Sequence, residues 1–427
     1  MLKRYPFALY VTWLTALIIF PTPLVFVLNH DMGYAMGNEL IFIDVGVIAY
    51  AWWLFEVYLA TRPLWLDRLI GLPALYLVHS LLGVGALLLA YIHRHYLFSM
   101  ANWIKLTGNT AWYLVIFGVV YASLFLSGWF VDRLPIVNRI KQKLMFILKH
   151  QTSMWIHRLN LIAIVLIWLH VHLIGRITSH LSFMLLFDLY SIAVFSCYAW
   201  KKIVSPTTEL TGFVKENKLL NDRTHQLVID FGTKRKFFEA GDFFFFTFKG
   251  ISNEKHPFSV SNLKATPKGL IVLTIREVGD YTKRISQAQI GTTVKAEGPF
   301  GRFASILTEN KNQALVLIGM GAGIAPLLNI ASEMEDKVPI KIIWTVAQEA
   351  DKYYDSQLKN LEGKKLNYHV QVGRLQPMQL KNLVTNQEAT EAKFFIVGSA
   401  AAVLNVRKML HRFGVKEENL IDERLTM

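Results

Sequence analysis

Long apolar runs separated by short polar loops fill the first half of the chain. Six runs are long enough to cross a bilayer as helices, which takes about 20 apolar residues each. We expect membrane spans at residues 7–28, 40–60, 73–97, 111–131, 153–174 and 181–200. The first run is too long for a signal-peptide core and lacks an Ala-x-Ala cleavage pattern, so we interpret it as a retained span.

After residue 200 the pattern changes to that of a water-soluble protein. Short β-rich runs between 208 and 304 predict a small antiparallel β-barrel. These runs are 212–220, 225–230, 243–248, 257–262, 269–277 and 292–297. From 312 onward, strand-like and helix-like runs alternate, which predicts a parallel α/β sheet. The predicted fold is therefore a multidomain membrane protein, with a six-helix transmembrane bundle (1–204), a β-barrel domain (205–305) and an α/β domain (306–427).

Two of the apolar runs contain histidines at membrane depth, where an imidazole is costly unless it has a partner. His79 and His93 lie fourteen residues apart and face nearly the same side of a helix. His157 and His170 lie thirteen residues apart, roughly 3.6 turns, which places them on different faces of an ideal helix. His172, fifteen residues after His157, would lie closer to the face of His157. Two helices with two histidines each are suited to hold two haems, one above the other.

The net charge of +14 is concentrated in alternate loops, which indicates membrane topology rather than nucleic-acid binding. On one side lie Lys3, Arg4, Arg62, Arg68, Arg133, Arg139, Lys141, Lys143, Lys149, Lys201 and Lys202, and on the other only Arg94, Lys105 and Arg176. The N-terminus, the 132–152 loop and everything after 200 are then cytoplasmic. Spans three and five run parallel, so His79 would pair with His157 on the inner side and His93 with His170 on the outer side.

Two smaller features complete the membrane half. The 132–152 loop mixes basic and apolar residues, which favours an interfacial amphipathic segment or a docking surface. Asp44, Glu56 and Asp188 fall inside spans, and we interpret them as interfacial. The chain has one cysteine, Cys197, so an internal disulfide and an iron–sulfur cluster are excluded.

Four motifs in the soluble half have the residue types of a nucleotide-binding protein. Residues 319–326 (GMGAGIAP) end a predicted strand and begin a helix, where glycines allow close approach of a diphosphate. Residues 256–259 (HPFS) could border a flat ring, and 279–283 (GDYTK) offers a hydroxyl and a cation to a diphosphate. Residues 297–301 (EGPFG) form a rigid turn between the two domains. Taken alone, each of the last three is better explained as a structural turn.

Together, the paired histidines and these motifs resemble the NADPH oxidase and ferric reductase superfamily over essentially the whole chain. The soluble half looks like a ferredoxin-NADP reductase module. The resemblance implies that the haem ligands are His79, His93, His157 and His170. The family spaces the two ligands on each helix by 14 and 13 residues, which favours His170 over His172. It implies that FAD is lined by His256, Pro257, Phe258 and Ser259, with Tyr281, Thr282 and Lys283 near its phosphates and Gly298 in the adjoining turn. The nicotinamide nucleotide would lie on Gly319, Gly321, Gly323 and Pro326, with Ser259 and Gly398 at the catalytic position.

The chain departs from that family at three places. Where the family's last strand usually ends in Cys-Gly-Pro, this chain has Val397-Gly398-Ser399-Ala400, and Leu425 stands where relatives carry an aromatic residue that stacks on the flavin. After the second strand of the nucleotide domain, Glu349 suits a ribose hydroxyl of NADH. Arg374 could instead serve the phosphate of NADPH, so both donors remain open.

The resemblance implies a plasma-membrane NAD(P)H oxidase or ferric reductase with two b-type haems. Electrons would pass from cytosolic NAD(P)H through FAD to the outer face, and we favour oxygen as acceptor, giving superoxide. The alternatives are a ferric-chelate reductase for iron uptake and an electron-transfer subunit that feeds a partner protein or a quinone. The chain has no EF-hand loop, so we expect no calcium gating, and it has no proline-rich tail, so we expect no obligatory protein partner. The placement of the positive charge in loops leads us to expect no nucleic acid.

Overall fold

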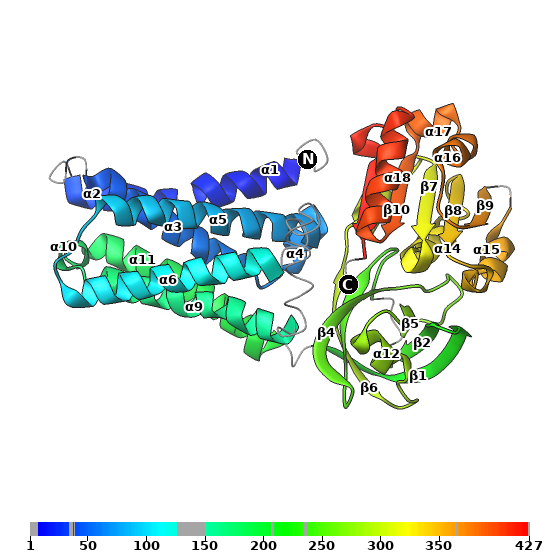
Figure 1. Ribbon diagram of the computed structural model, residues 1–427, viewed down its shortest axis with the longest axis horizontal. Helices are drawn as coiled ribbons and strands as arrows, with labels where there is room; N and C mark the ends of the chain where they lie inside the picture. Colours follow the sequence, from blue (N-terminus) through cyan, green and yellow to red (C-terminus); the bar gives the residue numbers. More distant parts are fainter. Residues whose placement is uncertain are drawn as a thin grey trace. The chain divides into compact units, whose positions relative to one another are not determined.

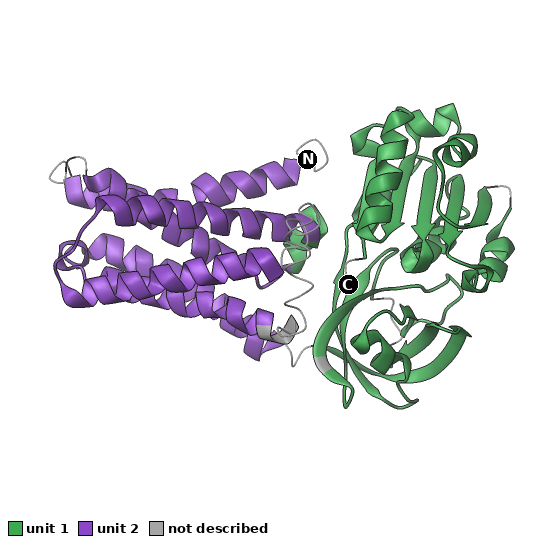
Figure 2. Cartoon of the chain, in the orientation of Figure 1, with its two compact units in different colours: residues 1–6, 64–72, 206–427 green, residues 7–63, 73–205 purple. Residues whose placement is uncertain are grey.

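The computed structural model describes residues 7–33, 37, 39–125, 150–205, 209–233, 237–363 and 365–425, without the side chains of 150–152 and 253. The chain forms two compact units (Figure 2). The helical unit contains Phe7–Pro63 and Pro73–Ser205. The sheet unit contains the described part of Pro206–Met427 and also takes in Leu64–Leu72 from between the second and third long helices.

Among the described residues, six helical stretches are long and apolar enough to cross a membrane, which confirms the predicted number. The first combines α1 (Phe7–Leu14), the π-helical η2 (Thr15–Ile19) and α2 (Thr22–Met32). The others are α3 (Glu39–Leu59), α5 (Leu72–Tyr96), α6 (Asn102–Phe125), α9 (His150–His172) and α11 (Leu181–Ile203), with the short α10 (Gly175–Thr178) between the last two. In Figure 1 they form a bundle in which α6 lies along α9.

One predicted helix boundary is wrong. The fourth long helix begins at Asn102 rather than at 111, because its polar first turns find local partners. Thr107 donates to the carbonyl of Trp103 at 2.9 Å, and the ammonium of Lys105 lies 5.0 Å from the ring centre of Phe98. The predicted amphipathic segment at 132–152 falls largely on 126–149, outside the described residues.

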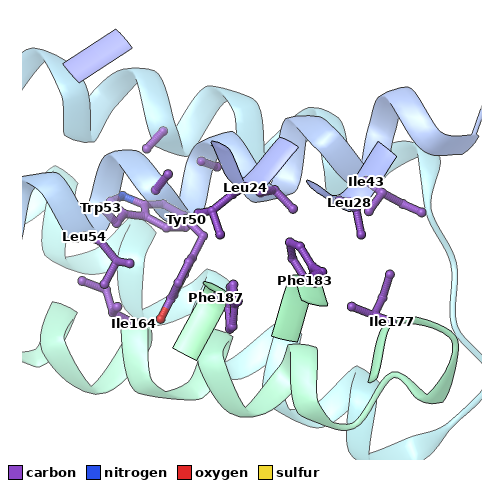
Figure 3. Close-up of a cluster of buried hydrophobic side chains, with 14 of the residues drawn as sticks. Leu24, Leu28, Ile43, Tyr50, Trp53, Leu54, Ile164, Ile177, Phe183 and Phe187 are labelled. Carbon is purple, nitrogen blue, oxygen red and sulfur yellow. The ribbon is translucent and has the colours of Figure 1, made fainter. Parts of the chain in front are cut away.

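A core of large side chains joins α2, α3 and α11 (Figure 3). Tyr50 of α3 stacks on Phe187 of α11 with ring centres 4.7 Å apart, and its hydroxyl lies 2.9 Å from that of Ser191. Leu24 and Leu28 of α2 complete this core. Burying aromatic and aliphatic side chains on several helices fixes the positions of α5 and α9, which carry the histidines.

The first sheet of the sheet unit is antiparallel and six-stranded, in the order β4-β3-β6-β1-β2-β5. Its strands are β1 (Leu210–Asn221), β2 (Thr224–Asp230), β3 (Phe243–Phe248), β4 (Ser252–Ser259), β5 (Leu270–Arg276) and β6 (Thr293–Phe300). The edge strands approach each other through one isolated bridge, Val260 to Leu273, so the hydrogen bonding does not form a continuously closed barrel. The fourth strand begins at Ser252, earlier than the predicted 257, because Ile251 closes a tight turn onto Phe248.

The second sheet is parallel and five-stranded, in the order β11-β10-β7-β8-β9, as the α/β pattern predicts. Its strands are β7 (Leu315–Met320), β8 (Ile340–Val346), β9 (Leu366–Val372), β10 (Lys393–Gly398) and β11 (Leu420–Arg424). The helices of this part are α14 (Ile324–Met334), α15 (Asp355–Leu361), α16 (Pro377–Leu383), α17 (Asn386–Glu391) and α18 (Ala400–Arg412). Three further short helices of the sheet unit are α4 (Leu64–Ile70), α12 (Asp280–Ser286) and α13 (Phe303–Glu309).

Candidate functional site

The end of β4 meets the carboxyl edge of the parallel sheet. The hydroxyl of Ser259, the last residue of β4, lies 3.5 Å from Oε1 of Glu423 in β11. Gly398 ends the adjacent strand β10, and its carbonyl accepts from the amide of Leu425 at 2.9 Å. The structure therefore brings the two predicted catalytic positions, Ser259 and Gly398, to one region and adds Glu423, which the sequence reasoning did not select.

Glu423 has an unusual acidity for a carboxyl group. Burial raises its pKa to about 7, with a further rise from the negative charge of Asp67 and an opposing effect of the Ser259 hydrogen bond. A group with such a pKa exchanges a proton near neutral pH, which is a property of catalytic acids and bases. In the sequence, Glu423 is only a single acidic residue two positions before Leu425. Such residues are too common for one of them to be recognised as part of a functional site.

The HPFS and GDYTK motifs lie side by side. The ring of His256 stacks on that of Tyr281 at 3.5 Å between centres, and the ring of Phe258 lies 6.4 Å from Tyr281. Pro257 pairs with Phe245 of β3, which directs these alternate side chains to one side of the sheet. Thr282 uses its hydroxyl to accept from the amide of Gly279 at 3.0 Å, while Lys283 is exposed.

The glycine-rich turn connects β7 to α14. Gly321 has a φ of +59°, a left-handed conformation that glycine adopts readily. A Cβ on Gly323 would lie 2.2 Å from the carbonyl oxygen of Val397, so only glycine allows α14 to begin this close to β10. Gly319 and Pro326 flank the turn, in β7 and in the first turn of α14. The predicted dinucleotide turn thus has the expected strand–turn–helix context.

Two nearby residues bear on the choice of donor. Glu349 follows β8, is largely exposed, and pairs with Lys352 at 2.7 Å. Arg374 follows β9 and is exposed. Their positions leave both donors open.

The EGPFG turn requires glycines. A Cβ on Gly298, whose φ is +152°, would lie 2.7 Å from the ring of Phe244. Gly301, with φ +127°, donates its amide to Oδ2 of Asp67 at 2.8 Å. The next residue of α4, Arg68, donates from both guanidinium nitrogens to Asp242, at 2.6 and 2.9 Å. Sequence reasoning treated Arg68 only as a topology signal and did not connect these residues.

In the helical unit, the predicted inner pair of histidines lies on α5 and α9. The ring centres of His79 and His157 are 6.0 Å apart, with ring planes at 74°. Nδ1 of His79 lies 3.2 Å from the carbonyl oxygen of Glu56. Because a carbonyl can only accept, Nδ1 carries the proton and Nε2 keeps a free lone pair, which is the form that binds a metal.

Nδ1 of His157 lies 3.4 Å from Nδ2 of Asn160, whose Oδ1 is buried without a hydrogen-bond partner among the described residues. Turning this amide over would present Oδ1 to Nδ1 and satisfy both groups, since the two amide orientations have nearly the same shape. That arrangement leaves Nε2 of His157 with a free lone pair, as in His79.

The predicted outer pair, His93 and His170, has the same arrangement. Nδ1 of His93 lies 2.9 Å from the carbonyl oxygen of Phe42 in α3, and Nδ1 of His170 lies 3.0 Å from that of Ile104 in α6. A glycine faces each ring: a Cβ on Gly46 would lie 2.4 Å from Nδ1 of His93, and one on Gly108 would lie 3.0 Å from Cε1 of His170.

The competing residue His172 has both ring nitrogens engaged. Its Nδ1 lies 2.9 Å from the carbonyl oxygen of Trp168, and its Nε2 lies within 3.4 Å of the carboxylate of Asp188. Asp188 also accepts from the indole of Trp168 at 2.7 Å. His172 therefore belongs to a local polar network, and His170 is the better candidate ligand.

Three buried polar atoms near the inner pair lack a hydrogen-bond partner among the described residues: Nε1 of Trp52, Oε1 of Glu56 and Oδ1 of Asn160. Glu56 packs against Gly83, where a Cβ would lie 2.5 Å from Oε1. Gly83 leaves room for the carboxyl group of Glu56 inside the bundle. Buried polar atoms without partners are rare and indicate a missing polar group or water.

The described residues contain no cluster of three or more His, Cys, Asp or Glu side chains that could hold a metal ion by themselves. The histidines occur in pairs instead. A pair suffices only for an ion that has its other ligands already, as the iron of a porphyrin does.

No family model matches the chain. It is similar to the electron transfer subunit of dihydroorotate dehydrogenase B of Shouchella clausii, 26% identical over 108 residues, covering 25% of this chain and 41% of the relative. It is also similar to one component of the Na⁺-translocating NADH-quinone reductase of Serratia proteamaculans, 24% identical over 209 residues, covering 41% of this chain and 50% of that component.

The chain therefore spans half or less of the length of these two curated relatives. Among solved structures, the cytochrome P450 reductase GcoB of Amycolatopsis superposes with a TM-score of 0.47 at 22% identity. That match covers 51% of this chain and 70% of the reductase.

Proposed function

We propose that the chain is a membrane-embedded oxidoreductase that takes electrons from cytosolic NAD(P)H through FAD. Two b-type haems, held by His79 with His157 and by His93 with His170, would carry the electrons to an acceptor on the outer face. The observation that supports this most strongly is the orientation of the rings. Three of the four turn Nδ1 to a backbone carbonyl and so leave Nε2 for a metal, the usual arrangement around metal-binding histidines.

The spacing of the inner pair fits an iron between the rings. A metal–imidazole bond is about 2.0 Å and the ring centre lies roughly 1.1 Å further, so two axial rings on one ion have centres about 6.2 Å apart. The observed separation is 6.0 Å. The partnerless Nε1 of Trp52 could donate to a porphyrin's carboxylate or to water, and the partnerless Oε1 of Glu56 could accept from water.

The sheet unit supplies the residues for flavin and nucleotide binding. When bound, FAD accepts a hydride from NAD(P)H as an electron pair and gives electrons up singly. His256, Phe258 and Tyr281 offer ring faces, and the turn at Gly321 offers backbone amides and the N-terminus of α14 to a diphosphate. The relatives named as an electron transfer subunit and as part of an NADH-quinone reductase support this part of the proposal.

Ser259 and Glu423 hold the proton that accompanies hydride transfer. With a pKa of about 7, the carboxyl of Glu423 exchanges its proton near neutral pH and hydrogen-bonds the hydroxyl of Ser259. The hydroxyl can accept this proton at Oγ and donate its own onward, so the pair connects the site to a titrating group.

Oxygen is the acceptor we propose first, with superoxide as product. A ferric chelate is the alternative on the same outer face. A second candidate function is an electron-transfer subunit that reduces a partner protein or a quinone, and it is favoured by the names of the similar proteins.

The test of the haem proposal is the reduced-minus-oxidised spectrum of the detergent-purified chain, with haem counted per chain. We expect a low-spin b-type signal and about two haems, because axial ligation by two histidines leaves no open position on iron. His79→Ala and His93→Ala should each remove about one haem. A chain without this signal contradicts the proposal.

The acceptor is tested separately by adding oxygen or ferric citrate to the NAD(P)H-reduced protein and detecting superoxide or ferrous iron. Reoxidation by neither, together with reoxidation by a quinone analogue, would select the second candidate.

A further inference from the structure

Helix α4 is a part of the sheet unit that comes from elsewhere in the sequence. It consists of Leu64–Ile70 and lies between the long helices α3 and α5, yet its contacts place it with the described part of 206–427. Figure 2 shows it in the colour of the sheet unit. The segment that leads directly into the histidine-bearing helix α5 is therefore built into the flavin module.

Two residues of α4 bind both backbone groups of Gly301. The amide of Gly301 donates to Oδ2 of Asp67 at 2.8 Å, and its carbonyl accepts from Nη1 of Arg68 at 2.9 Å. Gly301 ends the EGPFG turn in a conformation that only glycine adopts readily, with φ +127°. The shape of this turn therefore depends on α4.

Arg68 also binds Asp242, which supports the backbone next to Ser259. The guanidinium binds both carboxylate oxygens of Asp242, whose side chain is completely buried. The backbone carbonyl of Asp242 accepts from the amide of Val260 at 2.9 Å, and Val260 directly follows Ser259. A chain of contacts thus runs from Arg68 through Asp242 to the residue beside the catalytic hydroxyl.

Asp67 is the second link to the same site. It is fully buried, and its Oδ1 has no hydrogen-bond partner among the described residues. Its charge acts on Glu423, the partner of Ser259. On the same strand Asp422 and Arg424 flank Glu423, and Asp422 accepts from both Arg424 and Arg407.

We propose that α4 is a positioning element of the flavin site: Arg68 fixes the Ser259 region through Asp242, and Asp67 holds the EGPFG turn through the amide of Gly301. The inference rests on the proposed function for its chemistry, since it assigns a role toward the flavin's acid pair. Neither residue touches the reacting atoms, so both act through others. The consequence is that the loop entering α5 and the flavin site cannot change independently.

The experiment uses the full chain in detergent and follows flavin reduction by NAD(P)H without oxygen. Arg68→Ala should slow the hydride-transfer rate constant about tenfold and leave the nucleotide dissociation constant nearly unchanged, because a small displacement of a positioned group is costly to the chemical step. Guanidinium added at millimolar concentration should restore part of the rate, whereas sodium should not. The control Arg412→Ala, an exposed arginine on α18, should stay within about twofold of wild type.

The pH profile tests Asp67. Asp67→Asn removes a negative charge that raises the pKa of Glu423. The pH at which the flavin-reduction rate changes should therefore be lower than in wild type, while the maximal rate stays the same. Hydrogen exchange provides a readout that requires neither haem nor flavin: Arg68→Ala should raise exchange at 64–70, 239–243 and 298–303 together.

An unchanged rate in Arg68→Ala or unchanged exchange in the three segments would overturn the proposal, and a pH profile that does not move in Asp67→Asn would remove the link from Asp67 to Glu423. If the chain binds no flavin, the proposed function fails, but the exchange experiment still decides whether α4 holds these segments.

Discussion

Replacing Gly46 by alanine should disturb the proposed haem ligand His93 from the neighbouring helix. The added Cβ would lie 2.4 Å from Nδ1, whereas ordinary contact begins at 3.4 Å, so the ring must move by about 1.0 Å. That movement also breaks the 2.9 Å hydrogen bond from Nδ1 to the carbonyl of Phe42. Metal sites tolerate deviations of only about 0.2 Å in ligand distance.

We therefore expect Gly46→Ala to lower the haem content from about two to about one per chain, since second-shell changes cost tenfold or more in metal affinity. The assay is the haem count of the purified protein together with its difference spectrum. Gly108→Ala, whose Cβ would lie 3.0 Å from the ring of His170, should give a smaller loss. Gly175→Ala is the matched control, because nothing lies within 4 Å of its added Cβ.

The test compares the haem lost by the three variants, which should be largest in Gly46→Ala and smallest in Gly175→Ala. If Gly46→Ala keeps both haems with an unchanged spectrum, the ring of His93 is not a ligand held in this packing. If all three variants lose haem equally while remaining monodisperse, the effect is not due to the contact with the histidines.

The described contacts lead to four further predictions. Glu423→Gln resembles the protonated acid, so its flavin-reduction rate should stay at the low-pH value across the range where wild type changes near pH 7. The same raised pKa means that Glu423 stabilises the folded wild type at low pH and that this stability is lost as the pH rises from 4.5 through about 7, which denaturant titrations at several pH values would detect. His170→Ala should remove about one haem while His172→Ala keeps about two, and the reverse result would assign the ligand to His172. Arg407→Ala removes a largely buried guanidinium that pairs with Glu417 and Asp422 and leaves these two with His411 and Arg424 as remaining basic partners. It should destabilise the sheet unit by about 1–3 kcal/mol, seen as a lower thermal midpoint of flavin release than in Arg412→Ala.

The strongest predictions from sequence were those that rest on periodicity and length. Six apolar runs became six long helices, and the strand–helix alternation after residue 312 became a parallel sheet. The boundary at Asn102 failed because polar residues such as Thr107 bond to their own helix, which hydropathy does not register. The strand β11 was not predicted, since its sequence, LIDER, has no β-rich pattern and its pairing with β10 decides its conformation.

The candidate site was partly predictable. Spacing and resemblance found the histidines and the glycine turn, because these residues are rare at such positions. The choice between His170 and His172 could not be made from helical geometry. It depended on Asp188 and Trp168, which occupy both nitrogens of His172 in the folded chain.

Glu423 and the contacts of α4 could not be predicted from the sequence, for a different reason. Arg68 and Asp242 are 174 positions apart, and each is unremarkable in its own segment. Only the folded chain shows that Asp242 is buried and that Arg68 is its counter-ion. Long-range pairing of common residues leaves no local pattern, so the sequence alone had no signal for it.

The central claim is that electrons from NAD(P)H pass through a flavin to haem iron within one chain. Stopped-flow absorbance of the anaerobic purified protein, mixed separately with NADH and NADPH, tests it most directly. We predict that the flavin band bleaches first and that b-type haem absorption then appears for about two haems per chain. A flavin that is fully reduced while haem absorption does not change, or a chain that contains no haem, would contradict it.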